Sequence, residues 1–166
     1  MDYKWTFSGR FVNTDLERPR WRSTLNYSVS PKLQVGVEYN PEAEEFGPLF
    51  TWFLVTEGDR RAALFLGTSS DRIGSPEGTQ SYYLTAAKHH PAWPVSAYVS
   101  LSYSEWDEEL KVPFGAQVEL GRGVSLQPMY DGQRSHLLLS YNRERYGVSL
   151  LWVWLEEVGI SFNMGF

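Results

Sequence analysis

Apolar and polar residues alternate along most of the chain with a period of two. In residues 21–30, one parity carries Trp21, Leu25 and Val29, while the other carries Arg22 and Thr24. The same pattern returns in residues 3–11, 33–40, 95–104, 112–120, 124–127, 136–141, 146–154 and 157–166. Alternation of this kind is typical of β-strands that bury one face, and no segment shows a helical period. The chain is therefore predicted to be all-β.

Three further segments decide the number of strands. Residues 48–56 and 61–69 are apolar on both parities, and residues 80–88 are mixed. With all three counted there are about twelve strands, and ten is the alternative if the two apolar segments do not both span the sheet. Twelve strands in 166 residues leave about 14 residues for each strand and its connection, which suits membrane strands of roughly 9–11 residues. We predict one domain, residues 1–166, folded as an antiparallel up-and-down β-barrel.

A period of two fits two kinds of barrel that differ in which face is apolar. A soluble barrel or sandwich points its apolar face inward, whereas a membrane barrel points it toward lipid and lines its lumen with polar residues. In this chain the large aromatic residues of the apolar face stand at strand ends, and Leu, Val and Ala fill the centres. This distribution matches the aromatic girdles of membrane barrels. The predicted girdle residues are Trp5, Trp21, Tyr39, Tyr103, Tyr141, Tyr146, Trp152 and Trp154.

The polar parity combines small residues with few charges, as a narrow lumen requires. Gly and Ser recur on it, as at Ser100, Ser102 and Gly115. The predicted lumen-lining residues are Lys4, Arg10, Arg22, Glu38, Gln117, Glu119, His136 and Asn163. The basic members fall on the first two strands and the acidic members on later ones, so we expect separate basic and acidic sides that orient charged solutes. The alternative is a plugged barrel in which Arg and Glu pair with each other.

The connections between strands alternate in length. Short turns are expected at residues 30–32, 57–59, 121–123 and 143–145, and longer loops at 13–19, 41–47, 70–79, 105–110 and 128–133. Residues 87–94 are a long exception among the turns, and residues 156–157 are a short exception among the loops. Short periplasmic turns and longer external loops are the arrangement found in outer-membrane barrels.

The last ten residues carry a more specific pattern. Glu157 is followed by Gly159, by alternating hydrophobic residues that include Phe162 and Met164, and by a final Phe166. This segment resembles the C-terminal assembly signal of Gram-negative outer-membrane β-barrels, and the strand count resembles the small porin-like members of that class. The resemblance implies insertion into the bacterial outer membrane by the barrel-assembly machinery, with lipid around the barrel. A closed barrel pairs its last strand with its first.

Composition excludes several other classes of protein. The chain has no Cys, which removes disulfide scaffolds, zinc–cysteine sites and iron–sulfur clusters. Its 20 acidic and 15 basic residues give a net charge of −5, which argues against nucleic-acid binding. Aromatic residues make up 16% of the chain, too many for a disordered protein. There is no apolar run long enough for a transmembrane helix, and we expect no signal peptide at residues 1–5.

Candidate catalytic and metal-binding residues are few. His136 and Ser140 share one face of one strand, but their spacing of four residues separates them by about 13 Å, too far for a hydrogen bond. His89 and His90 stand beside Pro91 in an expected turn, and neighbouring residues of a strand-like segment point in opposite directions. No phosphate-binding or hydrolase motif is present. We therefore expect no metal, no cofactor and no catalytic residue.

These features predict an outer-membrane barrel with a narrow passive channel for small polar or charged solutes. The pattern leaves two alternative functions. The first is a non-conducting barrel that anchors or scaffolds partner proteins. The second is a lipid-modifying hydrolase at the barrel rim, which would depend on His136.

Overall fold

The computed structural model describes residues 3–15, 20–71 and 73–166, and these residues form thirteen strands and one turn of 3₁₀ helix. The strands are β1 (Trp5–Val12), β2 (Trp21–Ser30), β3 (Leu33–Asn40), β4 (Glu45–Val55), β5 (Ala63–Ser70), β6 (Gln80–His89), β7 (Val95–Ser104), β8 (Leu110–Lys111), β9 (Phe114–Gly121), β10 (Val124–Tyr130), β11 (Ser135–Asn142), β12 (Tyr146–Val153) and β13 (Glu157–Gly165). The 3₁₀ turn, η1 (Pro41–Ala43), lies between β3 and β4. Within the described ranges, no helix is long and apolar enough to cross a bilayer.

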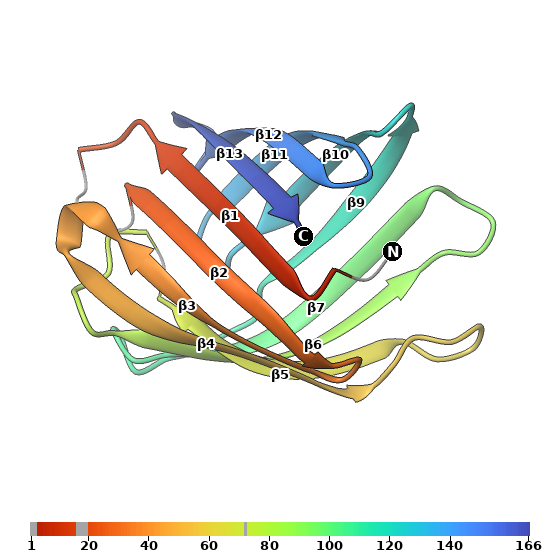
Figure 1. Ribbon diagram of the computed structural model, residues 1–166, viewed down its shortest axis with the longest axis horizontal. Helices are drawn as coiled ribbons and strands as arrows, with labels where there is room; N and C mark the ends of the chain where they lie inside the picture. Colours follow the sequence, from red (N-terminus) through yellow and green to blue (C-terminus); the bar gives the residue numbers. More distant parts are fainter. Residues whose placement is uncertain (1–2, 16–19, 72) are drawn as a thin grey trace.

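The strands form one antiparallel sheet that closes on itself (Figure 1). Strands β1 to β7 pair in sequence order, as do β9 to β13, and the pairs β7–β9 and β1–β13 complete the ring. The two-residue β8 also pairs with β7, so β8 and β9 occupy one position, interrupted at Val112 and Pro113. Pro113 has no amide hydrogen to donate to a neighbouring strand. The sheet is therefore a closed up-and-down barrel of twelve strands, which confirms the predicted fold class and favours twelve strands over ten.

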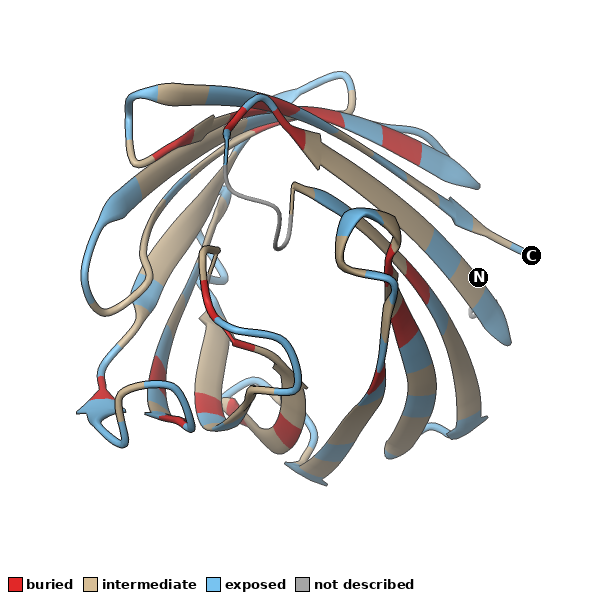
Figure 2. Ribbon diagram, turned by 90° about the vertical axis from the view of Figure 1, so that its left-hand side faces the viewer, coloured by how far each residue is buried: buried red, intermediate tan, exposed pale blue. Residues whose placement is uncertain are grey.

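The register places one parity of each strand inside the barrel and the other outside, and the strands are banded by burial accordingly (Figure 2). Most buried side chains are polar: Thr14, Thr24, Glu38, Asn40, Asp71, Ser75, Thr85, Ser100, Ser104, Lys111, Ser125 and Ser149. Neighbouring strands pair several of their hydroxyls in the lumen, such as Thr85 with Ser100 at 2.6 Å and Ser140 with Ser149 at 2.7 Å. These hydrogen bonds satisfy polar groups that would otherwise be costly to bury.

The two ends of the barrel differ in their connections. One end, called the turn end here, carries residues 31–32, 56–62, 90–94, 122–123 and 143–145, together with the start of β1 and the end of β13. The other, called the loop end, carries the described residues 13–15, 20, 41–44, 71, 73–79, 105–113, 131–134 and 154–156. Residues 16–19 of the expected loop 13–19 lie outside the described residues. The predicted alternation is thus right in outline. Residues 56–62 are longer than the expected turn, because Gly58 and Arg61 form an extra bridge within them.

The two segments that are apolar on both parities are β4 and β5, and their inward apolar residues pack inside the lumen. The rings of Phe53 and Phe65 lie 5.0 Å apart, and the ring of Tyr83 lies 6.4 Å from that of Phe65. Gly67 stands directly opposite Tyr83, and a Cβ there would lie 2.5 Å from the tyrosine oxygen. The glycine therefore makes room for the ring, and these aromatics narrow the lumen toward the turn end.

A small hydrophobic cluster crosses the lumen at the loop end. Val12, Leu151 and Val153 are buried together, and Ile73 from the β5–β6 connection packs against them. In the ring of twelve, β4, β3, β2, β1 and β13 separate β5 from β12 on one side, and β6, β7, β9, β10 and β11 separate them on the other. The connection that carries Ile73 thus reaches to the opposite wall of the barrel.

Candidate functional site

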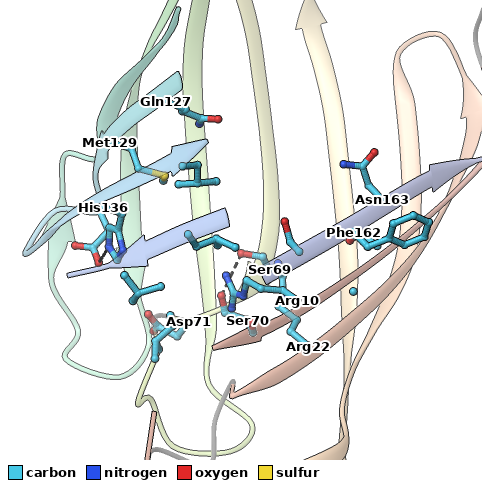
Figure 3. A pocket seen from close by; sticks show the side chains of 18 residues that line it. Arg10, Arg22, Ser69, Ser70, Asp71, Gln127, Met129, His136, Phe162 and Asn163 are labelled. Atoms are coloured by element: carbon cyan, nitrogen blue, oxygen red, sulfur yellow. Dashed lines mark hydrogen bonds and ion pairs between the residues drawn. The ribbon is translucent and has the colours of Figure 1, made fainter. Parts of the chain in front are cut away.

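A cavity of about 490 Å³ occupies the lumen (Figure 3). Its lining includes Arg10 of β1, Arg22 of β2, Ser69 of β5, His136 of β11 and Asn163 of β13. These strands come from different sides of the ring, so side chains leave open space across the barrel at this level. The cavity also extends along the barrel, because His136 is near the loop end of its strand and Asn163 is near the turn end of its own.

An ion pair stands beside the cavity on the wall formed by β2 and β3. Nη2 of Arg22 lies 2.6 Å from Oε2 of Glu38, whose side chain is fully buried. The amide of Asn40 donates to Oε1 of the same carboxylate at 3.0 Å. Thr24 is the direct cross-strand partner of Glu38, so Arg22 reaches the carboxylate from the diagonal position two residues away.

A second arginine faces the same pair. Arg10 is the direct cross-strand partner of Arg22, which places two guanidinium groups on neighbouring strands of the lumen wall. Like charges directly opposite each other destabilise a strand pair. The Nε atoms of both arginines are buried and have no hydrogen-bond partner among the described residues. Both donors are therefore unpartnered in side chains that line the cavity.

His136 is tied to the loop end of the barrel. Its Nε2 lies 2.8 Å from Oδ2 of Asp131, and its Nδ1 accepts from the amide of Trp154 at 3.4 Å. Burial opposes ionisation of Asp131, but hydrogen bonds from His136 and from the amides of Arg134 and Gln133 hold the pKa of this carboxyl below its usual value. The two residues organise the loop of residues 131–134 over this part of the cavity.

The candidate catalytic pair does not form. Ser140 shares its hydrogen bond with Ser149, and both ring nitrogens of His136 are engaged with the neighbours described above. His89 approaches Ser96, and the imidazole of His90 packs edge-on against Trp93 at 6.1 Å. The described residues contain no group of three or more side chains that would hold a metal ion.

The loops around the cavity mouth are held by buried polar contacts. Asp71 accepts from the hydroxyl of Ser104 at 2.6 Å and from the amide of Trp106 at 3.2 Å. Lys111 pairs with Asp107 and with Glu109. The Asp71 contacts join the start of the β5–β6 connection to the residues at the end of β7, and the Lys111 contacts hold residues 107–111 together.

The structure brings together only some of the predicted lumen residues. Arg10, Arg22, His136 and Asn163 line the cavity, with Glu38 beside it, whereas the others lie toward the turn end. Those others are Lys4, which is exposed just before β1, and Gln117 and Glu119 of β9, which are hydrogen-bonded to each other. The expected separation of basic and acidic sides is wrong at Glu38, because the β2–β3 register places this carboxylate beside Arg22.

Four inward-facing aromatic residues were not among the predicted lumen residues: Phe53, Phe65, Tyr83 and Tyr98. A usable signal is the pairing of a large ring with a glycine across the strand, since Tyr83 is opposite Gly67 and Tyr98 is opposite Gly115. This pairing depends on register, which alternation along a single strand does not reveal.

Seven of the eight predicted girdle residues lie on the outward face near strand ends. Trp5, Tyr141 and Tyr146 are near the turn end, and Trp21, Tyr39, Tyr103 and Trp152 are near the loop end. Trp154 is different, because β12 ends at Val153 and the chain turns there with a positive φ of 56°. Its ring packs against the Val12 cluster inside the loop end and under the guanidinium of Arg134, 4.7 Å away.

The residues of the predicted assembly signal form the closing strand. Glu157 and Gly159 lie on its inward parity. Phe162 and Met164 lie on its outward parity, and 39% of the surface of each residue is exposed. Phe166 exchanges two backbone hydrogen bonds of 3.0 Å with Trp5, so the end of the chain completes the seam between β13 and β1. Comparison of the sequence with protein-family models and with curated proteins gives no match.

Proposed function

We propose that the barrel spans a membrane with its outer surface against lipid. Its large hydrophobic residues are exposed on most strands, including Phe7, Leu25, Val37, Trp52, Leu84, Leu101, Phe114, Leu139, Leu150 and Ile160. A soluble monomer rarely exposes a continuous apolar patch of more than a few hundred Å². Covering one such side chain contributes about 1.5–3 kcal/mol, so a hydrocarbon environment for a belt of this kind is strongly favoured over water.

The membrane that suits this chain best is the bacterial outer membrane. The pattern from Glu157 to Phe166 resembles the assembly signal of that class, and the longer connections gather at the end opposite the short turns. Both features fit a barrel that is inserted by the barrel-assembly machinery with its turns on the periplasmic side.

We further propose that the lumen is a narrow passive channel for small polar or charged solutes. The observation that supports this proposal is the 490 Å³ cavity in the lumen, whose lining combines arginine, serine and amide side chains with apolar and acidic ones. A twelve-strand barrel has a wider interior than an eight-strand barrel, whose side chains fill it, and a narrower one than a porin of sixteen strands. Small hydrated solutes are the class that such a lumen admits.

A non-conducting barrel is the competing function, and one specific contact favours it. Ile73 reaches across the loop end to Val12, Leu151 and Val153, and this cluster obstructs part of the lumen. In such a barrel the function would lie in the connections at the loop end, which would present a surface to partner proteins. We propose no catalytic role for His136, because the ring nitrogen that does not contact Asp131 accepts from the amide of Trp154, and the hydroxyl of Ser140 hydrogen-bonds to Ser149.

Planar-bilayer recordings separate the two functions. Protein that is pure and folded should produce discrete conductance steps that persist in repeated preparations. Absence of steps, from protein whose folding is verified by heat-modifiable migration, would reject the channel and leave the non-conducting barrel. The membrane proposal has its own test, since the folded protein should need detergent or lipid to stay monodisperse. A monodisperse sample in plain buffer would contradict it.

A further inference from the structure

We propose that Arg10 and Arg22 form a binding site for one small oxyanion, a carboxylate or an inorganic phosphate, in the lumen cavity. The proposal rests on the proposed function only in placing this cavity inside a membrane barrel. Binding of the anion requires the folded lumen and no flow of solute through it.

The charge balance on the wall favours an anion. Arg10 and Arg22 are direct cross-strand partners, and the charged groups that act on Arg10 are Arg22 and Glu38. The carboxylate of Glu38 is committed to Arg22 at 2.6 Å and to the amide of Asn40 at 3.0 Å. In the described parts of the chain no carboxylate is paired with Arg10. Two positive charges thus share one negative charge, and an anion would balance the second.

The two arginines also have unused hydrogen-bonding capacity. The Nε atoms of Arg10 and Arg22 are buried without a partner, and both side chains line the cavity. A buried polar group without a partner in a native structure calls for a water or an ion. The guanidinium group is a planar fork that matches the paired oxygens of a carboxylate or a phosphate. Two forks side by side therefore select an oxyanion over a neutral solute.

The cavity offers both space and neutral hydrogen-bond donors for an anion. The cavity volume of about 490 Å³ corresponds to about sixteen waters at roughly 30 Å³ each, enough for a small anion and part of its hydration. Ser69, Ser161 and Asn163 line the same cavity and supply neutral donors. Figure 3 shows Arg10 and Arg22 set apart from the group of His136, Met129 and Gln127.

Two acidic residues also line the cavity, and both have donors of their own. Asp71 accepts from the Ser104 hydroxyl and the Trp106 amide, and Asp131 accepts from His136 and from the amides of residues 133 and 134. These donors hold the two carboxylates at the loop end. An external anion would therefore not compete with Asp71 or Asp131 for Arg10 and Arg22.

The test uses the arginine side chains as reporters. Full-length protein labelled with ¹⁵N-arginine is refolded in detergent micelles, and the Nε–Hε signals are followed during titration with sodium formate or, separately, sodium phosphate over a constant sodium chloride background. The signals of Arg10 and Arg22 should shift and saturate, while that of Arg122, exposed in the turn of residues 122–123, should not saturate. In Arg10→Gln the concentration that half-saturates Arg22 should rise at least about tenfold, as expected for loss of a charge-assisted hydrogen bond. Arg122→Gln is the matched control and should leave it unchanged.

Each outcome bears on the proposal. Saturation with formate only, with phosphate only, or with both supports the site and names the oxyanion chemistry that it accepts. Shifts of Arg10 and Arg22 that stay linear, like that of Arg122, overturn it. If Arg10→Gln does not fold, Arg10→Lys keeps the charge and should bind more weakly than the natural protein, and the comparison of Arg10 with Arg122 in one spectrum requires no variant. Because binding is measured in micelles, loss of the channel proposal would not alter this result.

Discussion

The guanidinium of Arg22 lies 2.6 Å from the carboxylate of Glu38, across the boundary between β2 and β3. Glu38 is fully buried, whereas 25% of the Arg22 side chain is exposed to the lumen. The pair lies beside Arg10, so removal of its acidic member would leave two neighbouring guanidinium groups without a carboxylate. Glu38 is therefore the buried carboxylate that compensates the arginine charge on the lumen wall of β1, β2 and β3.

Glu38→Gln should lower the free energy of unfolding by about 3 kcal/mol, because breaking a buried pair leaves an uncompensated charge. The measurement is urea unfolding in micelles, followed by tryptophan fluorescence. Glu119→Gln removes a carboxylate that is exposed near the turn end and should cost no more than about 0.5 kcal/mol. Equal effects of the two substitutions would show that Glu38 does not compensate the arginines.

The loop of residues 131–134 should loosen in acid. Burial alone would raise the pKa of Asp131, but hydrogen bonds from His136 and two backbone amides outweigh this effect and hold the pKa below its ordinary value. A lowered pKa means that the stabilisation is complete above the unfolded value of about 3.9 and is lost as the pH falls through the folded value. The amide signals of Gln133 and Arg134 should therefore titrate together with a midpoint below about 3.9. A midpoint at or above that value would contradict the arrangement, and Asp131→Asn should remove the transition.

Tyr83→Ala should raise the unit conductance of the channel, because the Tyr83 ring lies in the lumen beside Phe65. Tyr82→Ala is the matched control, since Tyr82 is the next residue of β6, points outward and is 48% exposed. The unit conductance of Tyr82→Ala should equal that of the natural protein. Recordings under identical salt and voltage compare the three proteins. Equal unit conductance for Tyr83→Ala and Tyr82→Ala would mean that Tyr83 does not line the conducting path.

Phe166→Ala should reduce the amount of folded barrel in the outer membrane of cells by several-fold, while refolding of the purified protein in micelles remains close to normal. The reason is that Phe166 belongs to the proposed assembly signal, whereas its contacts with Trp5 are made by the backbone and survive the substitution. Phe114→Ala removes an outward phenylalanine of similar exposure, 53% against 56%, and controls for lost lipid contact. Similar loss in both variants, or failure of Phe166→Ala to refold in micelles, would argue against an assembly signal.

The alternation of single strands predicts a large part of this fold. Residues 21–30 and 33–40 read as alternating strands, and they are β2 and β3 with the expected faces inside and outside. This succeeds because successive side chains of a strand point to opposite faces, so a local pattern reports the face of each residue. The same reasoning places Arg10, Arg22, His136 and Asn163 inside the barrel.

The alternation along single strands does not predict which residues meet across neighbouring strands or across the lumen. Only the register sets Arg10 opposite Arg22 and Glu38 within reach of Arg22, in place of separate basic and acidic sides. Only the closed barrel brings Ile73 to the cluster of Val12, Leu151 and Val153 and places Trp154 against this inner cluster, away from the outer girdle. The sequence by itself therefore determined the strands and their faces, which are local properties with a period of two. The tertiary structure decided the contacts across the lumen, because these join residues that are distant in the chain and depend on the register and closure of the whole ring.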